Sequence, residues 1–194
     1  MRGAQGDPDQ EPAEEPADGP SRTVVVTALV LSTLAVSVVL GIAATRRPPS
    51  GPVGPVGPVG IAAVPAPQAE SAECRALLAT LPDRLGDFRR ETVAEPAPPG
   101  AAAWRAGGNP VILRCGLDRP AEFVVGSPIQ QVNQVQWFRL DDADTGRSTW
   151  VSVDRPVYVA LTLPTGSGPA PIQALSGVIE RSMPAMPIRP GPPG

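Results

Sequence analysis

The chain lacks the two side chains on which many enzyme mechanisms depend. Its 194 residues include no histidine and no lysine. Histidine is the commonest general base and the commonest metal ligand in proteins, so Ser-His-Asp and Cys-His mechanisms are excluded. The absence of lysine also removes Schiff-base chemistry. We therefore expect no enzymatic activity and no cofactor.

Carboxylates are the remaining groups that could act as acid and base. Glu122, Asp141, Asp142 and Asp154 are candidates for the pair that a glycosidase needs, with carboxyl groups about 5 to 9.5 Å apart. Nothing in their spacing singles out one pair, and adjacent strand residues point to opposite faces of a sheet. A carboxylate-dependent cell-wall hydrolase is therefore kept as an alternative function, with no catalytic residue assigned.

An acidic segment resembles part of a calcium-binding loop. Asp141, Asp142 and Asp144 alternate before Gly146, as carboxylates do before the glycine of such a loop. Gly146 replaces an oxygen ligand, however, and no glutamate follows at the closing position. The segment predicts a solvated hairpin turn, and we assign no metal site.

Three tryptophans could contact a ligand. Trp104, Trp137 and Trp150 lie within the only part of the chain that contains aromatic residues, positions 88–158. Exposed aromatic rings stack on sugars or bind apolar chains, whereas buried rings form the core of a small domain. Both interpretations are open for each tryptophan.

The two cysteines, Cys74 and Cys115, could form a disulfide. They are 41 positions apart, so loop-closure entropy would give a bridge about 4 kcal/mol of stabilisation. Their spacing fits no zinc pattern. The alternative is a pair of buried free thiols.

These residues must be positioned by a domain that we predict at 71–183. Ser71 and Pro82 delimit a helix that turns Cys74 inward, and in PVILRCG the side chain of Cys115 shares one strand face with Val111 and Leu113. Further periodic segments predict strands at 135–140, 147–153 and 157–163, with a possible short strand at 86–93, and a C-terminal helix at 171–183. The order predicts a small two-layer α+β domain with a mostly antiparallel sheet and two helices.

The N-terminal part predicts attachment to a membrane. Residues 23–44 are uncharged and apolar, and as a helix they would span roughly 33 Å, enough to cross a lipid bilayer. Residues 1–22 predict a disordered acidic cytoplasmic tail, 45–70 a Pro/Gly-rich linker with the repeat GPVGPVGPVG, and 184–194 a disordered tail. A cleaved signal peptide is the alternative, although the acidic residues that precede the apolar segment are atypical of one.

Two signals in the sequence give opposite predictions for the orientation of this single span. Arg46 and Arg47 after the span favour a cytoplasmic C-terminus, and Arg2 and Arg22 before it match them in number. A disulfide favours the opposite orientation, because persistent disulfides form in oxidising compartments. We predict an extracytoplasmic C-terminal domain at the cell membrane. A cytoplasmic regulatory domain with reduced thiols is the alternative.

Three segments resemble a known family. WRAGGNPVILRCGLDRP, VNQVQW and VDRPVYVALTLP are similar to membrane-anchored envelope proteins of high-GC Gram-positive bacteria, catalogued as a domain of unknown function. The resemblance covers about 71–183 and implies a pairing of Cys74 with Cys115 and an external location, but no activity. This chain departs from the family pattern after Trp104, where Arg105 replaces the usual glycine.

Together, these features predict a non-catalytic binding or assembly module of the cell envelope. A cell-wall component or an envelope protein is the expected partner. The formal net charge is −3 and no basic cluster is present, so nucleic-acid binding is not expected.

Overall fold

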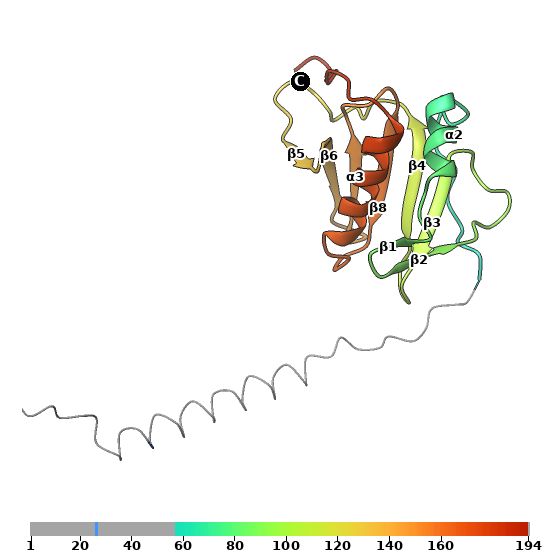
Figure 1. Ribbon diagram of the computed structural model, residues 1–194. Helices are drawn as coiled ribbons and strands as arrows, with labels where there is room; N and C mark the ends of the chain where they lie inside the picture. The colour runs from blue at the N-terminus through green and yellow to red at the C-terminus, as the bar shows by residue number, and fades with distance from the viewer. Residues whose placement is uncertain (1–25, 27–56, 194) are drawn as a thin grey trace, which may run out of the picture. The chain divides into compact units, whose positions relative to one another are not determined.

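The computed structural model describes residues 57–193, and before them only Val26 (Figure 1). This part of the chain forms one eight-stranded sheet with the order β1-β2-β3-β4-β8-β7-β6-β5, and every neighbouring pair is antiparallel. The strands are Arg84–Leu85 (β1), Phe88–Glu91 (β2), Ala101–Arg105 (β3), Val111–Leu117 (β4), Ile129–Val132 (β5), Val135–Asp142 (β6), Arg147–Ser152 (β7) and Tyr158–Leu163 (β8).

The sheet consists of two four-stranded meanders. The strands β1 to β4 are neighbours in chain order, and so are β5 to β8, but the second meander runs back toward the first. The two meanders join where β4 pairs with β8, for example at Leu113 and Leu161. A crossover at 118–128 carries the chain from β4, in the middle of the sheet, to β5 at its far edge.

Two helices lie on one face of the sheet (Figure 1). The helix α2, Ala72–Ala79, begins at Ser71, whose side chain accepts a hydrogen bond from the backbone N–H of Cys74 at 3.2 Å. The prediction of Ser71 as the N-cap is confirmed. The helix α3, Ala170–Ser182, has Pro171 in its first turn, as predicted, and contacts α2, β1, β5 and β6.

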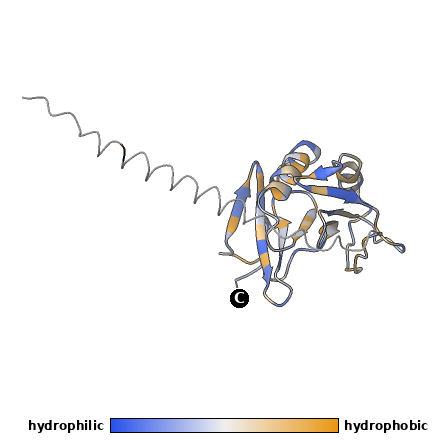
Figure 2. Ribbon diagram, turned by 90° about the horizontal axis from the view of Figure 1, so that it is seen from below, coloured by the Kyte–Doolittle hydropathy of each residue, from blue (hydrophilic) through white to orange (hydrophobic). Residues whose placement is uncertain are grey.

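The main hydrophobic core lies between the helices and the sheet. Hydrophobic and hydrophilic residues follow one another along the strands (Figure 2), and successive side chains of a strand point to opposite faces of the sheet. In β8, Val159 and Leu161 are fully buried against Leu175 and Ile179 of α3. The predicted period-2 pattern at 157–163 is thus the pattern of the central strand.

The other face of the sheet is covered by irregular segments. Val59 and Ile61 pack on Ala103 and Ile112, and Val59 forms a parallel bridge with Val93. These two side chains belong to the segment that the sequence predicts as linker.

A second cluster on this face covers the C-terminal meander. Phe123 of the crossover packs on Phe138 and Val153, with ring centroids of the two phenylalanines 5.4 Å apart. The tail beyond Met183 also lies here, because Gly191 forms a parallel bridge with Val124.

The predicted disulfide is confirmed. Cys74 of α2 and Cys115 of β4 are bridged, with their Cα atoms 5.7 Å apart. Both residues are fully buried. The bridge therefore fixes the first helix to a central strand inside the core.

The predicted fold class requires correction. A transmembrane helix was part of it, and within the described residues no helix is long and apolar enough to cross a membrane; the predicted span at 23–44 lies, except for Val26, outside those residues. The sheet has eight strands where the periodic segments predicted about five, and irregular chain covers its second face. The described domain is a mostly antiparallel eight-stranded sheet with two helices.

Short elements explain the missed strands. β1 has two residues and β3 reads AAAWR, so neither carries a periodic signal or a high β-propensity. Their pairing depends on neighbouring strands that are already part of the sheet.

Candidate ligand-binding groove

A groove of about 640 Å³ opens on the helix-bearing face of the sheet. The tip of the β6–β7 hairpin, the first turn of α3 and the loop 164–169 surround it. Its volume lies within the range of about 300–1,000 Å³ that is usual for small-molecule sites. The groove is therefore large enough for a small organic ligand.

A stacked aromatic ring and guanidinium form part of the groove wall. Trp150 of β7 and Arg139 of β6 are cross-strand partners, and the Cζ atom of Arg139 lies 5.4 Å from the Trp150 ring centroid. Asp141 holds the guanidinium through its Oδ1 atom, at 2.8 Å from Nε and 2.7 Å from Nη2. The indole N–H of Trp150 donates to the Ser148 hydroxyl at 3.3 Å.

Apolar side chains and neutral polar groups also line the groove, together with the charged Asp142 and Arg147. Leu163 and Ile172 are buried side chains that line it, together with Val132. Gln130 of β5 and Gln173 of α3 add amide groups that can both donate and accept hydrogen bonds. Such a surface suits a ligand with one apolar face and several hydroxyl or amide groups.

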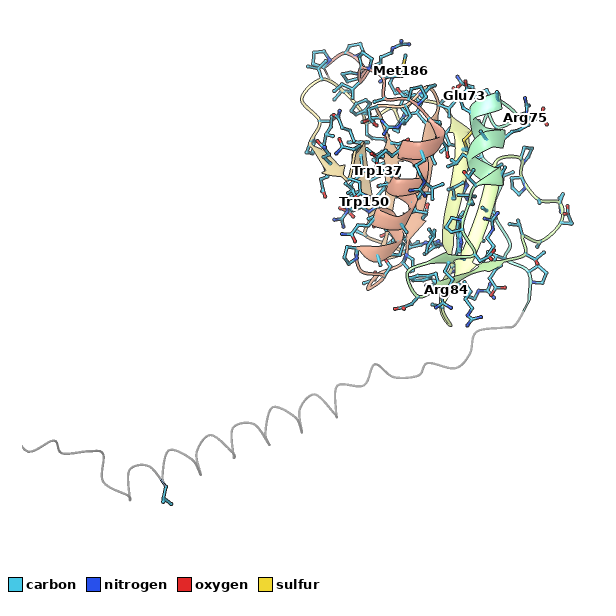
Figure 3. The ribbon with its side chains drawn as sticks, in the orientation of Figure 1. Glu73, Arg75, Arg84, Trp137, Trp150 and Met186 are labelled. Atoms are coloured by element: carbon cyan, nitrogen blue, oxygen red, sulfur yellow. A yellow bond between two sulfur atoms is a disulfide. The ribbon has the colours of Figure 1, made fainter. Side chains whose placement is uncertain are left out.

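The three tryptophans that the sequence suggested as possible ligand contacts have different environments in the structure. Trp104 and Trp137 are fully buried in the main core. Their indole N–H groups donate to the Pro82 carbonyl at 2.9 Å and to the Ser176 hydroxyl at 3.0 Å. Trp150 is partly buried and lines the groove; Figure 3 labels Trp137 and Trp150 beside α3.

Asp141 and Asp142 of the acidic hairpin accept hydrogen bonds from neighbouring residues of the protein. Asp142 accepts hydrogen bonds from the Thr145 hydroxyl at 2.7 Å and from the N–H groups of Thr145 and Asp144, both at 3.1 Å. These bonds, the hydroxyl first, lower the pKa of Asp142. Among the described residues no cluster of acidic or sulfur ligands is arranged to hold a metal ion.

The other candidate carboxylates lie apart from the groove wall. Asp154 is buried and pairs with Arg155, with Nη1 and Oδ2 2.9 Å apart. Burial raises the pKa of Asp154, while a hydrogen bond from the Gln136 backbone and the charge of Arg155 oppose the rise. Glu122 is exposed in the crossover. Neither Asp154 nor Glu122 lines the groove.

Arg139 and the loop 164–169 were missed from the sequence, although a signal for Arg139 exists. The turn between Asp142 and Arg147 sets the register of the hairpin, and counting outward from it pairs residue 139 with residue 150. The loop could not be found in this way, because its position depends on α3.

Comparison with known proteins places the chain in a family. Neither the curated proteins nor the solved structures contain a match. The family model described as "Protein of unknown function (DUF3515)" matches residues 29–188, which is most of the chain and includes both cysteines and the whole groove. The protein therefore belongs to the DUF3515 family.

Proposed function

We propose that this protein is a non-catalytic binding module of the cell envelope, and that its groove holds a saccharide unit of the cell wall. The observation that carries the proposal is the position of Trp150. Its ring lines the groove under the guanidinium of Arg139.

The chemistry of the groove matches the two kinds of surface on a sugar. The C–H face of a pyranose packs on an aromatic ring, and Trp150 provides this ring. The hydroxyl groups at the sugar edge need planar polar partners, which Arg139 and Asp141 provide as a fixed pair. Gln130 and Gln173 can bind an N-acetyl amide or further hydroxyl groups.

Binding is favoured over hydrolysis by the state of the groove carboxylates. A general acid needs a raised pKa, whereas the pKa of Asp142 is lowered by its bonds to Thr145. Among the described residues, the carboxyl group whose pKa is raised is that of Asp154, and it lies outside the groove lining. The Oδ1 atom of Asp141 already accepts a hydrogen bond from Arg139.

The disulfide supports a location outside the cytoplasm. Cys74 and Cys115 are bridged, and such bridges persist in oxidising compartments. Labelling of intact cells with a membrane-impermeant thiol reagent tests this location. Labelling of intact cells only after reduction supports it, whereas thiols that are reached only after lysis place the domain in the cytoplasm and contradict it.

The saccharide proposal is tested by co-sedimentation of the purified protein with isolated bacterial cell walls. We expect the wild-type protein to pellet with the walls. Trp150→Ala and Arg139→Ala should weaken binding at least about tenfold, because each removes half of the stacked surface. Trp150→Phe should retain part of the binding.

A matched control separates binding from folding. Arg84→Ala changes an exposed arginine on β1 that does not line the groove, and it should bind walls as the wild type does. Arg139→Ala leaves the core intact, since Arg139 is 43% exposed. A wild-type protein that stays in the supernatant, or equal binding by Arg139→Ala and Arg84→Ala, would refute the proposal.

A further inference from the structure

A second cavity, of about 300 Å³, lies next to the groove. Phe88 and Asn109 line it, from β2 and from the loop between β3 and β4. Arg147 and the loop residues 164–167 line both cavities. The two cavities are therefore separated by a shared wall, which we call the ridge and define as residues 164–167.

The ridge is held in place by one hydrogen bond to the neighbouring hairpin. The Thr165 hydroxyl donates to the backbone carbonyl of Gly146, at the tip of the β6–β7 hairpin. Arg147, beside this contact, donates to the Pro110 carbonyl at 3.0 Å. The ridge is thus tied to the hairpin, and the hairpin to the chain before β4.

The ridge has one position without a side chain, Gly166. Gly166 has φ +79°, and no atom lies within 4 Å of the position that a Cβ would take there. Gly168, just beyond the ridge, has the same open space at φ +67°. Glycine adopts this left-handed backbone without strain, so a tight turn can close the loop with no side chain above it.

We propose that the groove and the second cavity are neighbouring subsites for one linear saccharide chain, which crosses the ridge at Gly166. This inference rests on the proposed function and names its ligand class: an oligosaccharide of the wall polymer. One disaccharide unit of the chain lies in the groove against Trp150, and a sugar of the following unit lies in the second cavity.

The second cavity offers a smaller version of the same chemistry. The ring of Phe88, only 9% exposed, gives an apolar wall. Asn109 is exposed and presents an amide that can both donate and accept hydrogen bonds. The hydroxyl groups of a sugar edge can pair with this amide and with Arg147, which also lines the cavity.

The test measures affinity against chain length. Glycan fragments released from isolated cell walls by enzymatic digestion are separated into disaccharides and longer chains, and each fraction is titrated into the full-length protein by calorimetry. The longer chains should bind about tenfold more tightly than the disaccharides, because they occupy both subsites. Asn109→Ala should remove most of this advantage and leave disaccharide binding unchanged.

A second variant tests the path over the ridge. Gly166→Asn adds a side chain at the crossing point while keeping a residue that tolerates a left-handed backbone. It should reduce the affinity for long chains to that for disaccharides. Trp150→Ala should weaken binding of both fractions.

The outcomes distinguish the two proposals. Equal affinity of the wild-type protein for both fractions, or an Asn109→Ala variant that keeps the full advantage of long chains, would overturn the two-subsite inference and leave the groove as a site for one disaccharide unit. Absence of binding to either fraction would refute the proposed function itself.

Discussion

At the scale of single residues, a buried hydrogen bond connects the sheet to α3. The indole N–H of Trp137 donates to the hydroxyl of Ser176 at 3.0 Å, and both residues are fully buried. A buried donor without an acceptor loses its hydration and gains nothing in return. Ser176 is thus a polar residue of the core whose hydroxyl oxygen is needed as the acceptor for Trp137.

We therefore expect Ser176→Ala to lower the free energy of unfolding by about 1–3 kcal/mol. Urea denaturation monitored by tryptophan fluorescence measures this change. In a Trp137→Phe background the same substitution should cost little, because the N–H is already gone. Equal costs in both backgrounds would show that the hydrogen bond contributes no coupling energy.

Asp142 gives the hairpin tip a pH-dependent stability. The Thr145 hydroxyl, its main partner, holds the pKa of Asp142 below the ordinary value of 3.8. A lowered folded-state pKa stabilises the protein above the unfolded pKa, and this contribution is lost as the pH falls through the folded value.

Asp142→Asn should therefore destabilise the protein at neutral pH and have a smaller effect well below pH 3.8. Thermal melts of both proteins across this range provide the measurement. Asp144→Asn is the control, because it makes the same charge change and leaves the Thr145 hydroxyl bond in place. If both variants show the same pH profile, the hydrogen bonds of Asp142 are not the cause.

At the scale of elements, the approach of the segment before α2 to β4 requires a glycine. Gly116 lies in the irregular register of β4 at φ +86°, and its carbonyl accepts a hydrogen bond from the N–H of Gln68 at 3.0 Å. A Cβ atom at this position would overlap the backbone of Gln68 and Ala69.

Gly116→Ala should therefore cost more than about 3 kcal/mol, since backbone strain and steric overlap add. Gly107→Ala is a matched control. Its φ is +87°, and no atom lies within 4 Å of the added Cβ, so only backbone strain of about 1–2 kcal/mol is expected. Unfolding midpoints in urea compare the two variants, and similar losses would contradict the role of the close approach.

The elements with a strong local signal were predictable from the sequence, and the others depend on tertiary contacts. The pattern at 157–163 and the helix at 171–183 match β8 and α3 closely. Val59 and Ile61 are buried although their segment is rich in Pro and Gly, because they cover an apolar sheet face that the sequence does not reveal.

The residues of the candidate groove were likewise only partly predictable from the sequence. All three tryptophans occupy strand positions on the helix-bearing face, so periodicity cannot distinguish them. Trp137 lies under the middle of α3, where it reaches Ser176. Trp150 lies near the first turn of α3, where the groove opens, and only the placement of the helix over the sheet reveals this difference.

At the scale of the whole molecule, the disulfide should contribute much of the stability. It closes a loop of 41 residues, for which chain entropy gives about 4 kcal/mol. We expect the double variant Cys74→Ala/Cys115→Ala to lose about this amount in urea denaturation. The wild-type protein in reductant should lose a similar amount, whereas the variant should not respond to reductant; a wild-type protein insensitive to reduction would contradict this.

The junction of the two meanders has a consequence for how the chain is made. The bridge between Cys74 and Cys115 involves only the N-terminal meander and α2, so it can close before the residues after β4 have been synthesised. β4 pairs with β3 on one side, and its neighbour on the other side is β8, which comes last among the strands. Until β8 emerges, the edge of Val111–Leu117 exposes unpaired backbone groups and apolar side chains, and such an edge is a template for aggregation. A chain that ends before Tyr158 would contain both cysteines of the bridge and still leave this edge of β4 unpaired.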